Sequence, residues 1–179
     1  MPERIKAEIK HLPGIKEEDL LAKQLQKIND LFLTEYKLKV DDIEIIPLET
    51  EIYYHNANQK FEDKMIHKNE LQKNRFGQLY FHRYKKKNRN DENNTINITR
   101  GGVDICISEG NYYLSILLRM ATIGDNTIAG INKIQQQFYK GLNNEEIRKW
   151  LKKLENKKNL ITKRNKKDDR SEEHTSELQ

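Results

Sequence analysis

Residues 49–53 read Glu-Thr-Glu-Ile-Tyr, so two carboxylates and a phenol fall at alternate positions. In an extended strand alternate side chains point to the same face, which puts Glu49, Glu51 and Tyr53 together and Leu48 on the opposite face. A carboxylate beside other polar groups can act as a general base, whereas an exposed strand would simply present this face to water. The segment alone leaves both interpretations open.

Further candidate residues follow in short, separate segments. His67 lies in Ile-His-Lys-Asn at residues 66–69, and residues 77–81 read Gly-Gln-Leu-Tyr-Phe. Arg119 ends a Leu-Leu-Arg segment, and residues 130–136 read Gly-Ile-Asn-Lys-Ile-Gln-Gln. Each signal is weak alone, because single histidines are common in loops and cores and arginines are common on surfaces.

Asp104 interrupts the apolar segment Val-Asp-Ile-Cys-Ile at residues 103–107. Strand alternation places Asp104 beside Cys106 and opposite the apolar side chains. A partly buried carboxylate needs a polar partner, and Arg119 is a candidate; the alternative is an exposed or purely structural aspartate. Cys106 is the single cysteine, which excludes an internal disulfide, and its apolar neighbours favour a core position over a nucleophile.

Hydrophobic periodicity indicates which elements position these residues. Residues 16–32 carry leucine, isoleucine and phenylalanine at helical spacing, with acidic residues in the first turn. We expect strands near 35–40, 43–54, 79–84, 103–108 and 112–122, a polar loop at 85–99, and helices at 128–140 and from 143 or 144 onward. The order predicts one α+β domain over residues 1–169, with a mostly antiparallel central sheet and helices at both ends.

The last ten residues have a different origin in our interpretation. One reading frame of a common short-read sequencing adapter encodes the sequence of residues 170–179 codon by codon. We therefore exclude them from the fold and expect the natural gene to continue beyond residue 169. Without their one arginine and three glutamates, the formal net charge changes from +5 to +7.

Charge and hydropathy limit the classes of partner that we expect for this protein. Basic residues concentrate at Lys85, Lys86, Lys87 and Arg89, which favours a polyanion such as nucleic acid. No apolar run reaches the roughly 20 residues that span a bilayer, and the N-terminus lacks a signal-peptide pattern, so we expect no membrane partner and an intracellular location: the cytoplasm, or the nucleus in a eukaryote.

The histidines give no metal signal. His55, His67 and His82 match no compact metal-ligand spacing, so a metal hydrolase is the weakest of the functional hypotheses. Activity that persists in the presence of a chelator would exclude it.

Taken in order, these segments resemble the 3-methyladenine (alkylpurine) DNA glycosylase family. Its members carry Glu-Thr-Glu-x-Tyr, then a histidine, Gly-x-Leu-Tyr-Val, a Leu-Leu-Arg strand and a Gly-Pro-x-Lys-Leu-x-Gln helix start. The resemblance runs from Leu48 to Phe138, about half the chain, and is strongest at residues 49–53. The histidine comes later here than in the family pattern, and Ile131 replaces the proline.

The resemblance implies roles for individual residues. Glu51 matches the carboxylate that activates water, and Arg119 matches an arginine that positions the carboxylate or its water. Tyr53 and His67 match the rings that hold a flipped base, and Tyr80 belongs to the same substrate-binding set. At the helix start, the resemblance further implies DNA-phosphate contacts from Gly130 and Lys133.

The resemblance leaves the residue that screens purines open. Aligning Cys106 with the family's cysteine places Ser108 at the screening asparagine and Gly101 at the tyrosine that fills the vacated stack. A shifted alignment places Asp104 near that asparagine instead. Both Asp104 and Ser108 therefore remain candidates for substrate binding.

The expected function is that of a monofunctional DNA N-glycosylase in base excision repair. It would hydrolyse alkylated or deaminated purines from flipped nucleotides with Glu51 and water, without metal or cofactor, and would act on duplex DNA as a monomer. The alternative is a non-catalytic nucleic-acid-binding protein on the same scaffold, with affinity from the basic residues at 85–89.

Overall fold

The structure is a computed structural model that describes residues 2–60, 63, 65–82, 84–85, 96–97 and 101–165. Three of the predicted DNA-binding residues, Lys86, Lys87 and Arg89, lie outside the described residues, as do residues 170–179. Lys85 belongs to a two-residue strand, β4 (Tyr84–Lys85), which pairs with β5 (Ile96–Asn97). The structure does not describe the Lys85 side chain.

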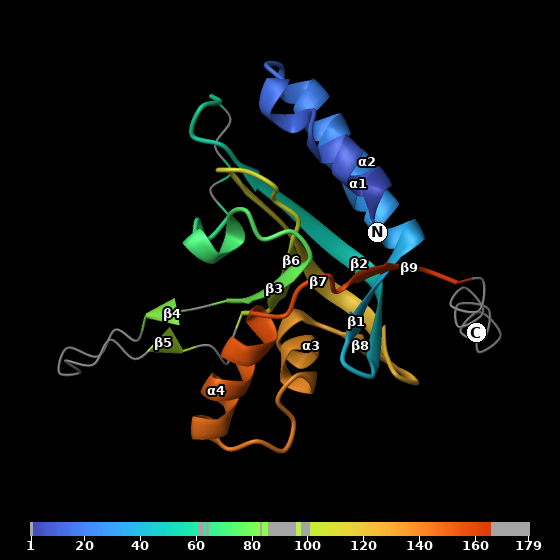
Figure 1. Cartoon of the computed structure of the whole chain (residues 1–179), viewed down its shortest axis with the longest axis vertical. Coiled ribbons are helices and arrows are strands. Elements are labelled where there is room, and N and C mark those ends of the chain that lie inside the picture. The colour runs from blue at the N-terminus through green and yellow to red at the C-terminus, as the bar shows by residue number, and fades with distance from the viewer. Residues whose placement is uncertain are drawn as a thin grey trace.

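A seven-stranded sheet forms the centre of the fold (Figure 1). Its strand order is β3-β6-β7-β2-β1-β9, and β8 also pairs with β7. All pairings between the described strands are antiparallel, which confirms the α+β prediction. The strands are β1 (Tyr36–Val40), β2 (Ile43–His55), β3 (Gln78–Phe81), β6 (Val103–Cys106), β7 (Tyr113–Ile123), β8 (Asn126–Ala129) and β9 (Ile161–Lys163).

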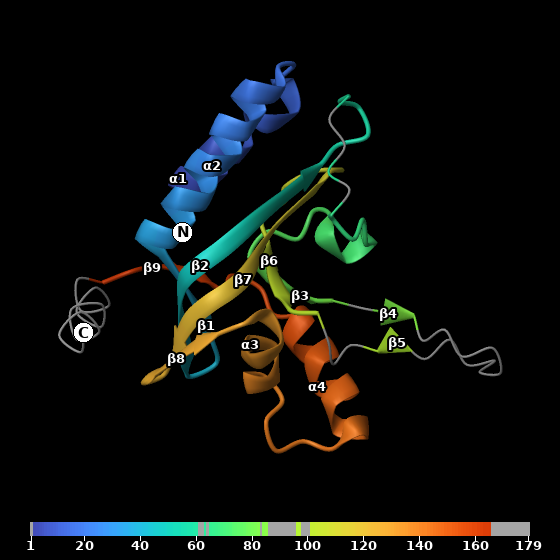
Figure 2. The same cartoon turned by 180° about the vertical axis from the view of Figure 1, so that it is seen from behind.

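Helices lie on both sides of the long β2–β7 pair. In both views α1 (Glu3–Ile9) and α2 (Glu18–Glu35) lie above these strands, and α3 (Ile131–Gln137) and α4 (Asn144–Glu155) lie below them (Figures 1 and 2). α2 contacts β1 and β2, α3 contacts β7, and α4 contacts β3. No helix among the described residues is long and apolar enough to cross a membrane.

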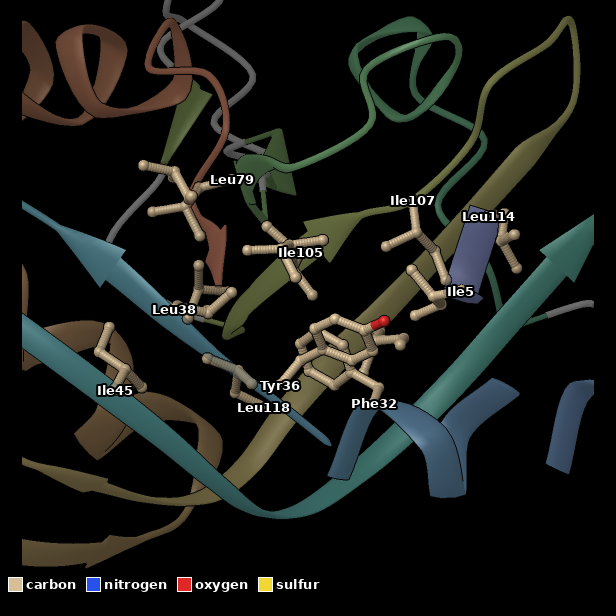
Figure 3. Packing of buried hydrophobic residues seen from close by; sticks show 14 of the residues in the cluster. Ile5, Phe32, Tyr36, Leu38, Ile45, Leu79, Ile105, Ile107, Leu114 and Leu118 are labelled. Carbon is tan, nitrogen blue, oxygen red and sulfur yellow. The ribbon is translucent and has the colours of Figure 1, made fainter. Parts of the chain in front are cut away.

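Alternation along the strands divides the sheet into an apolar face and a polar face. Leu114, Ile116 and Leu118 of β7 are fully buried on the face that also carries Val103 and Ile105 of β6. Helix α2 adds its apolar stripe to this core, which also includes Tyr36 and Leu38 of β1 (Figure 3). The polar side chains of β2, β6 and β7 therefore emerge on the other face, where the candidate site lies.

The prediction that a helix begins at residue 128 is wrong. Ile128 belongs to β8, which pairs with β7 across a turn where Gly124 has φ +59°, and α3 begins only at Ile131. Alternating side chains next to a glycine turn are typical of a hairpin, and this signal outweighs the helical spacing. Helix α1 and strand β9 were also not predicted, nor were the short elements η1 (Leu12–Gly14), η2 (Glu70–Gln72) and β5; β9 buries Ile161 within a lysine-rich segment.

Helix α4 begins with a reciprocal cap that gives a first testable prediction. The Glu146 amide donates to Asn143 Oδ1 at 3.0 Å, and the Asn143 amide donates to Glu146 Oε2 at 3.0 Å. Replacing Asn143 by alanine should lower the free energy of unfolding by about 1 kcal/mol, because a helix amide loses its acceptor. Urea unfolding measures the change. Asn143→Asp, which keeps the acceptor, should retain most of the stability, and equal losses in both variants would contradict the capping role.

Candidate active site

Pairing between neighbouring strands places three candidate residues and Leu117 in one row across the polar face of the sheet. Tyr80 of β3 pairs with Asp104 of β6, Asp104 pairs with Leu117 of β7, and Leu117 pairs with Glu51 of β2. Because neighbouring strands lie about 4.8 Å apart, the backbones at Asp104 and Glu51 are separated by two spacings, or about 10 Å. Leu117 lies between the two carboxylates.

A pocket of about 600 Å³ opens over this row. The strands provide its floor, the segment at residues 65–72 provides one wall, and the start of α3 provides another. Its lining combines apolar and ionisable side chains: Glu49, Glu51, Tyr53, Met65, Ile66, His67, Gln72, His82, Gly101, Asp104, Leu117, Arg119, Ala129, Gly130 and Ile131. The volume lies in the usual range for sites that bind small organic ligands.

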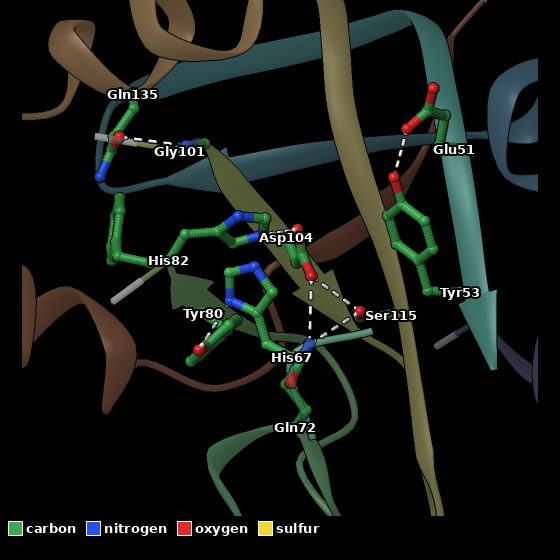
Figure 4. A network of polar contacts seen from close by, with 12 residues as sticks. Glu51, Tyr53, His67, Gln72, Tyr80, His82, Gly101, Asp104, Ser115 and Gln135 are labelled. Atoms are coloured by element: carbon green, nitrogen blue, oxygen red, sulfur yellow. Dashed lines mark hydrogen bonds and ion pairs between the residues drawn. The ribbon is translucent and has the colours of Figure 1, made fainter. Parts of the chain in front are cut away.

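A carboxylate cluster of Glu49, Glu51, Tyr53 and Arg119 occupies the β2 side of the pocket. Arg119 Nη1 donates to Glu51 Oε1, and its Nε lies 3.0 Å from Glu49 Oε1. The Tyr53 hydroxyl donates to Glu51 Oε2 (Figure 4). Burial and the neighbouring Glu51 carboxylate raise the pKa of Tyr53, so this hydroxyl stays protonated and remains a donor.

Irregular pairing between β2 and β7 brings Arg119 to this cluster. The register shifts between Pro47 and Glu49 and again between Glu49 and Thr50, so Arg119 has no direct partner in the ladder. Bulges of this kind redirect side chains and occur next to active sites. The Glu51 hydrogen bond and charge raise the pKa of Arg119, which keeps the guanidinium charged.

An Asp104 network, made of Asp104, Gln72, His82 and Ser115, fills the β3–β6 side of the pocket. Asp104 is 1% exposed; its Oδ1 lies 2.7 Å from His82 Nε2, and its Oδ2 accepts from Ser115 Oγ at 2.7 Å and from Gln72 Nε2 at 3.3 Å (Figure 4). The hypothesis that Arg119 is the partner of Asp104 is therefore wrong. Arg119 pairs instead with the two glutamates of β2.

His67 covers the Asp104 network from the pocket wall. Its ring lies 4.1 Å from the His82 ring, centroid to centroid, at an interplanar angle of 48°. Tyr80 is buried beside both rings, and its hydroxyl lies 3.5 Å from His67 Nδ1. His67 and Tyr53 thus line one pocket from different elements, whereas Tyr80 supports His67 from behind the lining.

Two other predicted residues lie outside the pocket. Ser108 is fully buried in the β6–β7 connection, where its hydroxyl donates to the carbonyl of Tyr112 at 2.6 Å and also lies 3.0 Å from the carbonyl of Gly110. Lys133 is exposed on α3 and is not part of the lining, although Gly130 is. Of the two candidates for the screening position, the structure therefore brings only Asp104 to the pocket.

Sequence reasoning missed the partners of Asp104. His82 continues the alternation of Gln78 and Tyr80 beyond β3, so the strand pattern could have placed it on the polar face. Gln72 comes from a one-turn helix, η2 (Glu70–Gln72), and its position depends on tertiary packing. Ser115 lies opposite Cys106 in the register, which only strand pairing reveals.

Comparisons with known proteins do not assign the chain to a family. No family model matches it, no curated protein matches it, and no solved structure matches it. Within the described part of the chain, no group of three histidine, cysteine, aspartate or glutamate side chains lies close enough to hold a metal ion.

His67 gives a pH-dependent prediction. Partial burial, followed by the neighbouring His82, lowers the pKa of His67 from its ordinary value of 6.5, and Asp104 opposes this shift. The unfolded chain therefore binds more protons near this pH, and stability contributed by neutral His67 is lost as the pH falls below 6.5. An NMR titration, assigned with His67→Gln, should give a midpoint below 6.5, and a midpoint at or above that value would contradict the burial.

Proposed function

We propose that this protein is a monofunctional DNA N-glycosylase that removes damaged purines, alkylated or deaminated, from a flipped nucleotide. The observation that carries the proposal is the position of Glu51: a carboxylate in a pocket, held by Arg119 and Tyr53 beside an apolar floor. Base flipping requires a pocket of this kind, because the bond to be cut is inaccessible inside a duplex.

The chemistry assigned to Glu51 is activation of water. Arg119 and Tyr53 donate to different oxygens of the carboxylate, which fixes its orientation. Each carboxylate oxygen has two lone pairs, so one donor on each leaves capacity to accept a proton from water. The same negative charge stabilises the positive character that develops on the sugar as the base leaves.

The remaining lining suits a planar base. Leu117 provides an apolar floor between β2 and β6, and the rings of Tyr53 and His67 provide surfaces for stacking. Stacking on such rings contributes about 1–3 kcal/mol per base. The formal net charge, +5 for the full sequence and +7 without residues 170–179, favours attraction to the phosphate backbone of DNA.

The test is whether the chain generates abasic sites. A labelled duplex with one hypoxanthine or one 7-methylguanine is incubated with the protein and then treated with alkali, which breaks the strand at abasic positions. The proposal predicts breaks at the modified nucleotide and none in an unmodified duplex. Intact strands, despite DNA binding, would favour the non-catalytic nucleic-acid-binding alternative.

A further inference from the structure

A second groove lies between α3 and α4, away from the candidate active site. It encloses about 510 Å³ where the chain turns from one helix into the other, at the lower end of both helices in both views (Figures 1 and 2). This α3–α4 groove shares no lining residue with the pocket over Glu51. The pocket touches the first residue of α3 and the groove touches the last, about 9 Å away along the helix.

The interior of the α3–α4 groove is apolar and aromatic. Phe138, Tyr139 and Trp150 are half-buried and pack against the core of the domain, whereas Leu142 is 37% exposed. Apolar grooves of this kind receive an apolar side chain of a partner, and one buried anchor can supply much of the binding energy. The lining therefore suits a ligand that presents a leucine or an aromatic side chain.

Hydrogen bonds and a ring contact hold the walls of the groove in place. Trp150 Nε1 donates to the Phe138 carbonyl at 2.6 Å, which joins α4 to the residue after α3. The Phe138 ring packs edge to face on Phe81 of β3, with 5.4 Å between centroids, and the Leu142 amide donates to the Tyr139 carbonyl at 3.1 Å. Because the walls are already formed, a ligand pays little to order this side of the interface.

The rim of the groove carries an excess of positive charge. Among the described residues of the lining, three exposed lysines, Lys140, Lys149 and Lys153, accompany a single carboxylate, Glu146. Glu146 Oε2 already accepts the Asn143 amide in the cap of α4. The rim is thus complementary to a segment that carries aspartates or glutamates.

Contacts within the groove favour an acidic peptide over a nucleic acid. Unpaired bases bind by stacking on open aromatic faces. The Lys153 ammonium lies over the Trp150 ring, 5.2 Å from its centroid, and the Phe138 ring packs on Phe81. Ring surface for stacking is therefore already in use, whereas an apolar side chain needs only apolar contact area, which the groove supplies.

We propose that the α3–α4 groove binds an acidic peptide segment of a partner protein. One leucine or aromatic side chain of the segment inserts beside Leu142 and Trp150, and its carboxylates pair with the lysines of the rim. Recognition of peptides through an apolar anchor and complementary charges is a recurring binding mode. The proposal is independent of the reaction proposed for Glu51, because groove and pocket share no residue.

Selection from a displayed library of short random peptides tests the proposal on the full chain. The library omits tryptophan, so that Trp150, the single tryptophan of the chain, reports binding through its fluorescence. We expect the selected peptides to combine a leucine or aromatic residue with several aspartates or glutamates, and to shift the Trp150 emission until it saturates. No enrichment, enrichment of peptides without acidic residues, or acidic peptides that leave this emission unchanged would overturn the proposal.

Charge reversal at the rim measures the electrostatic part of the binding. Lys140→Glu combined with Lys149→Glu should weaken the affinity for the selected peptides by about tenfold, because attraction at the rim becomes repulsion. Lys10→Glu combined with Lys23→Glu makes the same change in net charge at exposed positions next to α1 and on α2, and should leave the affinity within a few fold. Equal losses in the two double variants would overturn the proposal.

Leu142→Ala tests the apolar contact and keeps the proposal falsifiable if the lysine variant does not fold. Its side chain is partly exposed, so the fold should tolerate the change, and the affinity should fall by about fivefold. Unchanged affinity would contradict the anchor. Unlabelled oligothymidine should neither displace the peptides nor shift the Trp150 emission; if it does both, the groove binds nucleic acid and the proposal is overturned.

Discussion

Replacing Glu51 by glutamine is expected to reduce base release by about 10²–10⁴-fold, because glutamine cannot take a proton from the attacking water. The substitution is nearly isosteric, and its carbonyl oxygen can still accept from Arg119 or Tyr53, the two donors to Glu51. We therefore expect DNA binding and thermal stability to change little. Single-turnover rates on a modified duplex, together with the affinity for the same duplex, measure the two effects separately.

Glu49 provides the matched control. It lies two residues earlier on the same face of β2, and it contacts Arg119 through Nε at 3.0 Å. Glu49→Gln changes the same charge but leaves the Glu51 carboxylate in place, so its rate should remain within about tenfold of the wild type. If the two variants lose activity equally, the effect is one of pocket charge and Glu51 is not the general base.

The largest expected effect on stability comes from Phe32, at the last turn of α2. Its ring is fully buried among Tyr36, Leu118 and other core residues between α2 and the sheet (Figure 3). Phe32→Ala removes this contact area and leaves a cavity, which should lower the free energy of unfolding by about 3–5 kcal/mol. Because single domains are stable by only about 5–15 kcal/mol, the variant should be close to unfolding at moderate temperature.

Leu20 of the same helix is the control for this prediction. Its side chain is 50% exposed, so Leu20→Ala should change the free energy of unfolding by no more than about 0.5 kcal/mol. Chemical denaturation of both variants gives the comparison. A small loss in Phe32→Ala would mean that α2 does not pack on the sheet as described.

Local patterns predicted the parts of the site that depend on a single strand. Alternation in residues 49–53 correctly placed Glu51 and Tyr53 on one face, and alternation in residues 103–107 correctly placed Asp104 opposite the apolar side chains. Both results follow from the two-residue period of a strand. The same rule predicted five strands of the central sheet.

Contacts between distant segments could not be predicted in this way. Asp104 binds Gln72 and His82, which lie 32 and 22 residues away in the chain, and Arg119 lies 68 residues from Glu51. Which partner a buried carboxylate takes depends on strand order, register and bulges. A strand pattern fixes the face on which a side chain lies but not its neighbour from another strand, so Arg119 was a wrong candidate for the partner of Asp104.

The measurement that tests the central claim most directly is detection of free base by mass spectrometry. Excess protein is mixed with a duplex that carries one 7-methylguanine, the base whose release we propose to depend on Glu51. We expect free 7-methylguanine in an amount equal to the abasic sites formed, well above the spontaneous loss in buffer. No release above that background, from folded protein that binds the duplex, would contradict it.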